Sequence, residues 1–149
     1  TSIEILEDTG GNIDCFVAGV GTSGTLSGVA SALLTYNPEL YVAAVEPAGS
    51  AVLSGNPKGS HKITGIGAGF IPKFYDKNLV NEVIPIEDDA AFEMSKLIAK
   101  TEGLSIGISA GAALVAAVEI AKRPEMKEKN IVVILPDAAE RYFSVDGFA

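Results

Sequence analysis

Short apolar runs alternate with amphipathic stretches along this chain. Apolar runs of about four to eight residues that are bounded by turn residues are typical of buried strands. The pattern predicts strands at residues 16–20, 41–46, 80–86, 104–108 and 131–135.

The stretches between these runs carry apolar residues at helical spacing. After the first strand they recur at i, i+3, i+4 and i+7, which predicts a helix that ends before Pro38. Its apolar positions are Leu26, Val29, Ala30, Leu33 and Leu34. Further helices are predicted at 88–102, where Asp88 is placed to cap the first turn, and at 112–122. Shorter helical pieces are predicted at 3–7 and 51–54.

This alternation of strands and helices predicts the fold class. A helix between two buried strands is the βαβ unit of a parallel sheet. The chain is therefore expected to be α/β, with a doubly wound, mostly parallel sheet and helices on both faces, in three αβα layers. In such folds ligands bind outside the carboxyl ends of the strands.

The turn after the first strand has the composition of an anion site. Residues 19–24 spell G-x-G-x-x-G between a predicted strand and a predicted helix. Backbone N–H groups and the positive end of the helix dipole would meet there, so we expect this turn to bind a phosphate. The spacing is compatible with a dinucleotide, with Glu46 on the ribose, and with another phosphorylated cofactor. A tight turn that needs small residues only for packing is the simpler alternative.

Composition narrows the choice of partner and compartment. The chain has 149 residues and a net charge of −8, which argues against nucleic acid or an anionic membrane as the main partner. Because basic side chains are few, a phosphate would be held mainly by backbone N–H groups and hydroxyls. Cys15 is the single cysteine, and a lone thiol inside a strand predicts an inert group, no metal site and a reducing, cytoplasmic compartment.

Four motifs, the first of which contains this turn, follow one another along the chain. They are G-T-S-G-T-L-S-G with V-E-P-A-G-S, H-K-I-T-G-I-G-A-G-F-I-P, G-I-S-A-G-A-A, and I-V-V-I-L-P-D-A-A-E-R-Y-F-S. In order and spacing, this set resembles the cysteine synthase (O-acetylserine sulfhydrylase) family of pyridoxal-phosphate enzymes, which has the tryptophan-synthase-β-like fold. The resemblance runs from about Asp14 to Ser144 and covers roughly the second half of such an enzyme, which fits the abrupt ends of the chain.

The resemblance implies cofactor-binding residues in two places. The residues that match the family's phosphate cradle are Gly21, Thr22, Ser23, Gly24 and Thr25. Ser23 stands where the family usually has a glycine, so its backbone must keep a compatible angle, while its hydroxyl adds a donor. Ser109 matches the serine that faces the pyridine nitrogen, and a neutral hydroxyl there makes the ring a weaker electron sink than an aspartate would. From the residues alone, Ser109 could also be the N-cap of the following helix.

The second glycine cluster resembles the loop on the substrate side of the cofactor. Its expected substrate-binding residues are Gly65, Ile66, Gly67 and Ala68; a plain surface loop is the alternative. His61 matches a family position but has no evident acid–base partner, which favours a structural role. In the last motif, Ala139 replaces a glycine of the family, which alters the turn after Pro136 but not the implied chemistry.

The family's catalytic lysine has no counterpart in this chain. In the family this residue forms the Schiff base and acts as the general base, and it belongs to the first half of the enzyme, before residue 1 here. No catalytic residue is therefore expected in this chain. Residues 1–149 are predicted to be mainly the C-terminal, large PLP-binding domain of a two-domain enzyme, without its N-terminal domain.

The implied reaction makes L-cysteine from O-acetyl-L-serine and sulfide by β-elimination and β-replacement through an aminoacrylate. The family is typically a homodimer and can bind serine acetyltransferase. Two alternatives stay open. Ser109-Ala110-Gly111 and Pro136-Asp137 resemble cystathionine β-synthase, which performs a related β-replacement. The chain could also be a non-catalytic phosphate- or dinucleotide-binding α/β module.

Overall fold

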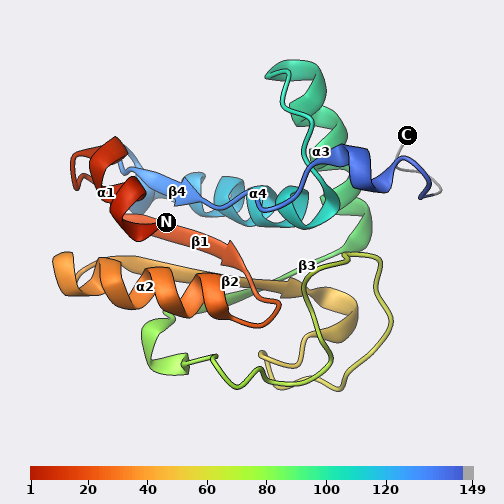
Figure 1. Cartoon of the computed structure of the whole chain (residues 1–149), viewed down its shortest axis with the longest axis horizontal. Coiled ribbons are helices and arrows are strands. Elements are labelled where there is room, and N and C mark those ends of the chain that lie inside the picture. Colours follow the sequence, from red (N-terminus) through yellow and green to blue (C-terminus); the bar gives the residue numbers. More distant parts are fainter. Residues whose placement is uncertain (146–149) are drawn as a thin grey trace.

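Four parallel strands form the centre of the molecule in the computed structural model, which describes residues 1–145 (Figure 1). Every strand pair in the sheet is parallel, and the strand order is β3-β2-β1-β4. The strands are β1 (Cys15–Gly19), β2 (Tyr41–Pro47), β3 (Glu82–Ile86) and β4 (Ile131–Val133). The predicted parallel sheet is thus confirmed, and the ends of its four strands lie within two residues of the predicted ones.

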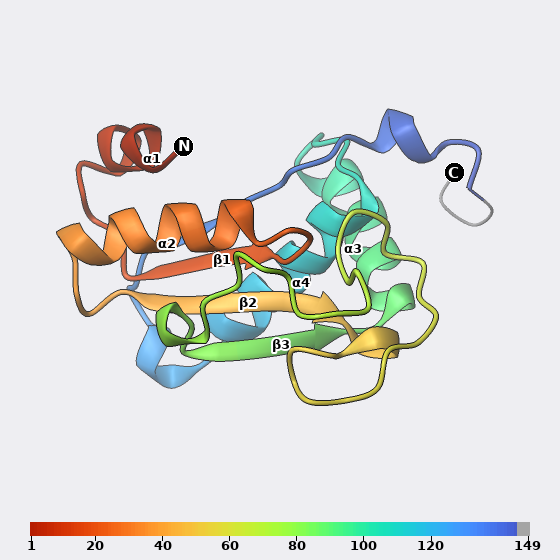
Figure 2. The same ribbon diagram turned by 60° about the horizontal axis from the view of Figure 1, so that its bottom comes forward.

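Helices cover both faces of this sheet (Figure 2). Successive residues of a strand point to opposite faces, so Phe16 and Ala18 pack in one apolar cluster and Cys15 and Val17 in the other. The first cluster includes residues of α1 (Ser2–Thr9) and α2 (Gly24–Tyr36). The second includes residues of α3 (Asp88–Thr101) and α4 (Ile108–Ala121). The three-layer αβα prediction is confirmed.

The helix α2 shows how the apolar pattern determines this packing. Its buried residues are Leu26, Val29, Ala30 and Leu33, four of the five positions in the predicted stripe, and the fifth, Leu34, is partly buried against the same cluster. The helix ends at Tyr36, and Asn37 takes an extended backbone, as expected for the residue before Pro38. At the other end, α2 begins at Gly24, so the predicted anion turn includes the start of the helix.

The predicted strand at 104–108 is wrong. Only an isolated antiparallel bridge between Ile106 and Ala138 forms there, and Ile108 already belongs to α4. Two predicted N-caps are also wrong: Gly107 caps α4 in place of Ser109, and Glu87 caps α3 in place of Asp88. The Asp88 carboxylate instead accepts a hydrogen bond from the Lys62 N–H at 2.9 Å.

The expected helical piece at 51–54 lies slightly earlier in the chain. A 3-10 helix forms at Ala48–Ser50, and residues 52–55 make a turn. The turn is held by Glu46, whose carboxylate accepts hydrogen bonds from the N–H groups of Leu53 and Ser54. These side-chain bonds replace the i to i−4 pattern that a helix would need.

Cys15 is fully buried in β1. Removal from water disfavours the charged thiolate and raises the pKa of the Cys15 thiol to about 12. The thiol is therefore protonated at neutral pH, in keeping with the inert role that its place in a strand predicts.

An ionic cluster lies at the end of the sheet opposite to the predicted anion turn. The Arg123 guanidinium, just after α4, binds both carboxylate oxygens of Glu82 at 2.8 and 3.0 Å, and the Tyr41 hydroxyl donates to the same carboxylate at 2.7 Å. The hydrogen bond from Arg123 holds the pKa of Glu82 below its ordinary value.

Replacing Arg123 by alanine is expected to lower the free energy of unfolding by about 1 kcal/mol at pH 7, because the bidentate pair is only partly exposed. A lowered folded-state pKa means that Glu82 stabilises the fold above its unfolded pKa and loses this contribution as the pH falls through the folded pKa. Urea unfolding should therefore show the difference at pH 7 and lose it in acid. Lys129→Ala, which breaks the more exposed pair with Asp14, is the control and should change stability less.

Candidate functional site

The turn between β1 and α2 presents several backbone N–H groups without partners. Gly24 is the first residue of α2, and its N–H makes one long bond, 3.3 Å, to the Thr22 hydroxyl. Within residues 1–145, no acceptor is bound by the backbone N–H of Gly21, Thr22, Ser23 or Thr25. These N–H groups and the helix dipole form an arrangement suited to an anion.

Ser23 keeps the backbone angle that a glycine at this position would take. Its φ is 67°, in the left-handed region that glycine occupies more easily. The side chain is buried, and its hydroxyl pairs with the Ser27 hydroxyl at 3.0 Å, one turn along α2. The hydroxyl of Ser23 thus bonds within the helix, while its N–H stays available.

The second glycine cluster lies directly against this turn. A Cβ on Gly21 would be 2.5 Å from the carbonyl oxygen of Gly65, so only glycine allows this approach. The Gly67 N–H donates to the Val20 carbonyl at 3.1 Å, which joins the two loops. The cluster thus packs against the turn through Gly67 and the buried Ile66, while Gly65 and Ala68 are exposed, as in the alternative of a plain surface loop.

His61 fixes the shape of the second loop. Its Nδ1 accepts a hydrogen bond from the Ile63 N–H at 3.2 Å, which leaves Nε2 protonated to donate to the Gly67 carbonyl at 2.9 Å. Both ring nitrogens are used within the loop, so His61 has the geometry of a structural residue.

Ser109 lies in the first turn of α4, next to the second loop. It is 4% exposed, and its hydroxyl lies 3.8 Å from the position that a Cβ on Gly65 would take. Among the described residues its hydroxyl has no hydrogen-bond partner. A nearly buried hydroxyl without a partner beside a cavity is a ready donor or acceptor for a ligand.

One cavity of about 330 Å³ joins these parts. It brings together the turn after β1, the start of the second loop, the first turn of α4 and the segment after β4. The residues that line it are Gly19, Gly21, Thr22, Ser23, Gly24, Thr25, Gly65, Ile66, Ser109, Pro136, Asp137, Arg141 and Tyr142. All six residues expected to bind the cofactor therefore share one cavity.

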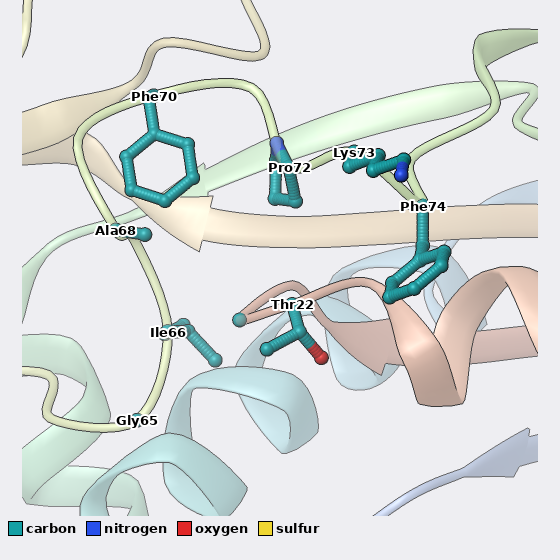
Figure 3. A pocket seen from close by; sticks show the side chains of 9 residues that line it. Thr22, Gly65, Ile66, Ala68, Phe70, Pro72, Lys73 and Phe74 are labelled. Atoms are coloured by element: carbon teal, nitrogen blue, oxygen red, sulfur yellow. The ribbon is translucent and has the colours of Figure 1, made fainter.

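A second, more apolar cavity of about 500 Å³ adjoins the first at Gly21, Thr22, Gly65 and Ile66 (Figure 3). Figure 3 shows the Thr22 side chain between Phe74 on one side and the second loop on the other. The other lining residues are Ala68, Phe70, Pro72 and Lys73. Of the four expected substrate residues, Gly67 lines neither cavity, and its N–H and carbonyl are bonded within the loops.

The polar or charged residues of the first cavity that sequence reasoning missed as site residues are Asp137, Arg141 and Tyr142. The Asp137 carboxylate accepts hydrogen bonds from the N–H groups of Ser109 and Ala110, and the Tyr142 hydroxyl donates to it at 2.6 Å. Burial, and then this bond, raise the pKa of Tyr142 above its ordinary value, so its hydroxyl stays protonated. All three residues stand in the last motif of the family resemblance, and the Pro-Asp pair after a predicted strand was a further local signal.

The described residues contain no group of three or more His, Cys, Asp or Glu side chains arranged to hold a metal ion. Among the helices of the same residues, none has the length and apolar character needed to cross a membrane. The polar groups of the first cavity are backbone N–H groups, hydroxyls and the side chains of Asp137, Arg141 and Tyr142.

Comparison with known proteins gives a consistent result. The model of the family described as "Pyridoxal-phosphate dependent enzyme" matches residues 1–137. Cysteine synthase 3 of Caenorhabditis elegans is 47% identical over 98% of this chain and 43% of its own length. O-acetylserine sulfhydrylase isoform 3 of Entamoeba histolytica is 48% identical, with a TM-score of 0.96 over 97% of this chain and 43% of that structure.

A third relative is named for a different activity. The O-acetylserine-dependent cystathionine β-synthase of Helicobacter pylori is 39% identical, with a TM-score of 0.91 over 99% of this chain and 48% of that structure. In each comparison the chain spans less than half the length of the protein that it matches.

Proposed function

The chain belongs to the pyridoxal-phosphate-dependent enzyme family, and on this premise we propose that residues 21–25 hold the phosphate of pyridoxal 5′-phosphate (PLP) while Ser109 faces its pyridine nitrogen. The observation that carries this proposal is the single cavity that joins the two groups of residues. Gly65, Ile66 and Ala68, beside the same turn, are proposed to contact the amino-acid substrate. Gly67 supports them from within the loop.

The residues present fit this cofactor. A dianionic phosphate needs several donors, and the turn offers free N–H groups at the positive end of α2. An aromatic nitrogen needs one donor or acceptor, and the unpartnered Ser109 hydroxyl provides it. When bound, PLP supplies an electron sink for charge that develops at the α-carbon of an amino acid. Ser109, as a neutral hydroxyl, orients the ring without fixing a proton on its nitrogen.

We propose that the chain is mainly the large, C-terminal domain of a two-domain cysteine synthase. Its substrates would be O-acetyl-L-serine and sulfide, as the names of its relatives indicate. The lysine that acts on the α-proton would come from a domain outside residues 1–149. A homodimer in the cytoplasm, with serine acetyltransferase as a protein partner, completes the proposal.

The test uses the protein that carries this chain, purified from its own cells. The enzyme proposal predicts an intact mass about twice that of the chain, a visible absorbance from bound PLP that changes when O-acetylserine is added, and formation of cysteine with sulfide. A stable, colourless species of 15.4 kDa would instead support a non-catalytic binding module.

The Helicobacter pylori relative favours homocysteine as a second candidate nucleophile beside sulfide. Ser109-Ala110-Gly111 and the Pro136-Asp137 pair resemble cystathionine β-synthases. Sulfide and homocysteine should therefore be offered together with O-acetylserine. Preference for sulfide supports the cysteine synthase proposal, and preference for homocysteine replaces it with the cystathionine β-synthase one.

A further inference from the structure

Asp137 binds the first turn of α4 with both its backbone and its side chain. Its carbonyl accepts a hydrogen bond from the Gly107 N–H at 2.9 Å. Its carboxylate accepts the Ala110 N–H at 2.8 Å and the Ser109 N–H at 3.3 Å. These are N–H groups that the helix itself cannot satisfy, so a residue far away in the sequence caps α4.

Asp137 is itself held in place. The Tyr142 hydroxyl donates to the same carboxylate at 2.6 Å. Gly107 permits this arrangement, because a Cβ there would overlap both the Asp137 carboxylate and the Tyr142 ring. From the other side, the Ser95 hydroxyl of α3 donates to the Gly107 carbonyl at 3.0 Å. The first turn of α4 is therefore fixed from two directions.

The charge of Asp137 acts at the place where Ser109 meets the proposed cofactor ring. The amino end of a helix carries about half a positive charge. A positive end beside a pyridine nitrogen disfavours a proton on that nitrogen, and the neutral Ser109 hydroxyl does not offset it. The Asp137 carboxylate lines the same cavity as Ser109 and carries a full negative charge bonded to this helix end. The other charged or titratable side chains that line the cavity are Arg141 and Tyr142.

We propose that Asp137 is a positioning residue of the cofactor site: it fixes the Ser109 turn and offsets the positive end of α4 at the ring nitrogen. The inference rests on the proposed function, because it takes the cavity at Ser109 as the ring site. The positioning role of Asp137 and the assignment of the cofactor site can fail separately. Asp137 sets the electrical environment of the ring, whereas the turn after β1 sets whether the phosphate binds.

The test uses the whole protein that carries this chain, stripped of its cofactor and titrated with pyridoxine 5′-phosphate. This probe keeps the ring and phosphate of PLP but lacks the aldehyde, so it binds without a Schiff base. The ultraviolet absorbance of the bound probe follows protonation of its ring as the pH is varied. In Asp137→Asn the pKa of the bound ring should fall by about one unit, because the negative charge that lines the same cavity as Ser109 is lost.

Two further variants make the result specific. Asp137→Ser keeps an oxygen that can cap α4 but carries no charge, so it should lower the ring pKa in the same way. Asp14→Asn makes the same chemical change at a carboxylate that also binds a backbone N–H, that of Asn130, and does not line the cavity. It should leave the ring pKa unchanged.

The outcomes separate the two proposals. A lowered ring pKa in the Asp137 variants, with no change in Asp14→Asn, supports the positioning role. An unchanged ring pKa in whichever Asp137 variant folds overturns that role and leaves the cofactor assignment standing. A parent protein that does not bind the probe at all overturns the cofactor assignment and this inference with it.

Discussion

Replacing Gly21 by alanine is expected to weaken binding of pyridoxine 5′-phosphate by roughly 30- to 100-fold, equivalent to about 2–3 kcal/mol. The new Cβ would lie 2.5 Å from the Gly65 carbonyl oxygen, closer than real contacts allow. The Cβ is fixed to the backbone of one loop and the carbonyl belongs to the backbone of the other, so one of the two loops must move. The free N–H groups of the turn then no longer converge, and the cavity at their junction changes shape. Forcing an extra carbon into this contact should also cost roughly 1–3 kcal/mol of stability.

Gly28, in the helix α2 that follows this turn, provides a matched control. It is exposed in α2, and a Cβ there would meet nothing within 4 Å. Gly28→Ala should leave probe binding unchanged and raise the free energy of unfolding by about 0.5–1 kcal/mol, because alanine favours a helix interior. Binding is measured by titration and stability by urea unfolding. Full affinity in Gly21→Ala would show that the contact between the two loops does not shape the anion site.

The elements that could be predicted are those with a local pattern. The run Tyr41–Pro47 is apolar and flanked by turn residues, which is typical of a buried strand, and the structure places it inside the sheet. The stripe on α2 has helical spacing and faces the sheet. Parallel strands bring their carboxyl ends to one edge, so the turn at residues 21–25 and the loop at 65–68 meet there.

The first turn of α4 could not be predicted, because its cap comes from elsewhere in the chain. The apolar run at 104–108 is as short as a strand, and nothing nearby marks Gly107 as a helix start. The carboxylate that satisfies the Ala110 N–H belongs to Asp137, 27 residues later. Local propensity and spacing carry no information about such a contact. For the same reason, Arg141 and Tyr142 entered the candidate site only with the structure.

Replacing Glu46 by alanine is expected to cost more stability than breaking the ion pair between Arg123 and Glu82. Glu46 is 1% exposed, and its carboxylate accepts hydrogen bonds from the Leu53 N–H at 2.8 Å, the Ser54 N–H at 2.9 Å and the Ser54 hydroxyl at 2.6 Å. Glu46→Ala should lower the free energy of unfolding by roughly 3 kcal/mol, because it leaves two backbone donors without their acceptor and a void behind. Urea unfolding measures this loss.

Two milder variants test the cause of that loss. Glu46→Gln keeps the shape of the side chain but places an amide beside two N–H donors, and it should lower the free energy of unfolding by about 1–2 kcal/mol. Ser54→Ala removes one hydrogen bond and should lower it by about 1 kcal/mol.

The same variants decide between the two interpretations of the glycine turn. A carboxylate that bound the ribose of a dinucleotide would be needed for ligand affinity and would contribute little to stability. Because Glu46 already bonds the turn at 52–55, we expect Glu46→Gln to lower stability and to leave the affinity for pyridoxine 5′-phosphate within about threefold of the parent. A strong loss of NAD binding with unchanged stability would restore the dinucleotide interpretation.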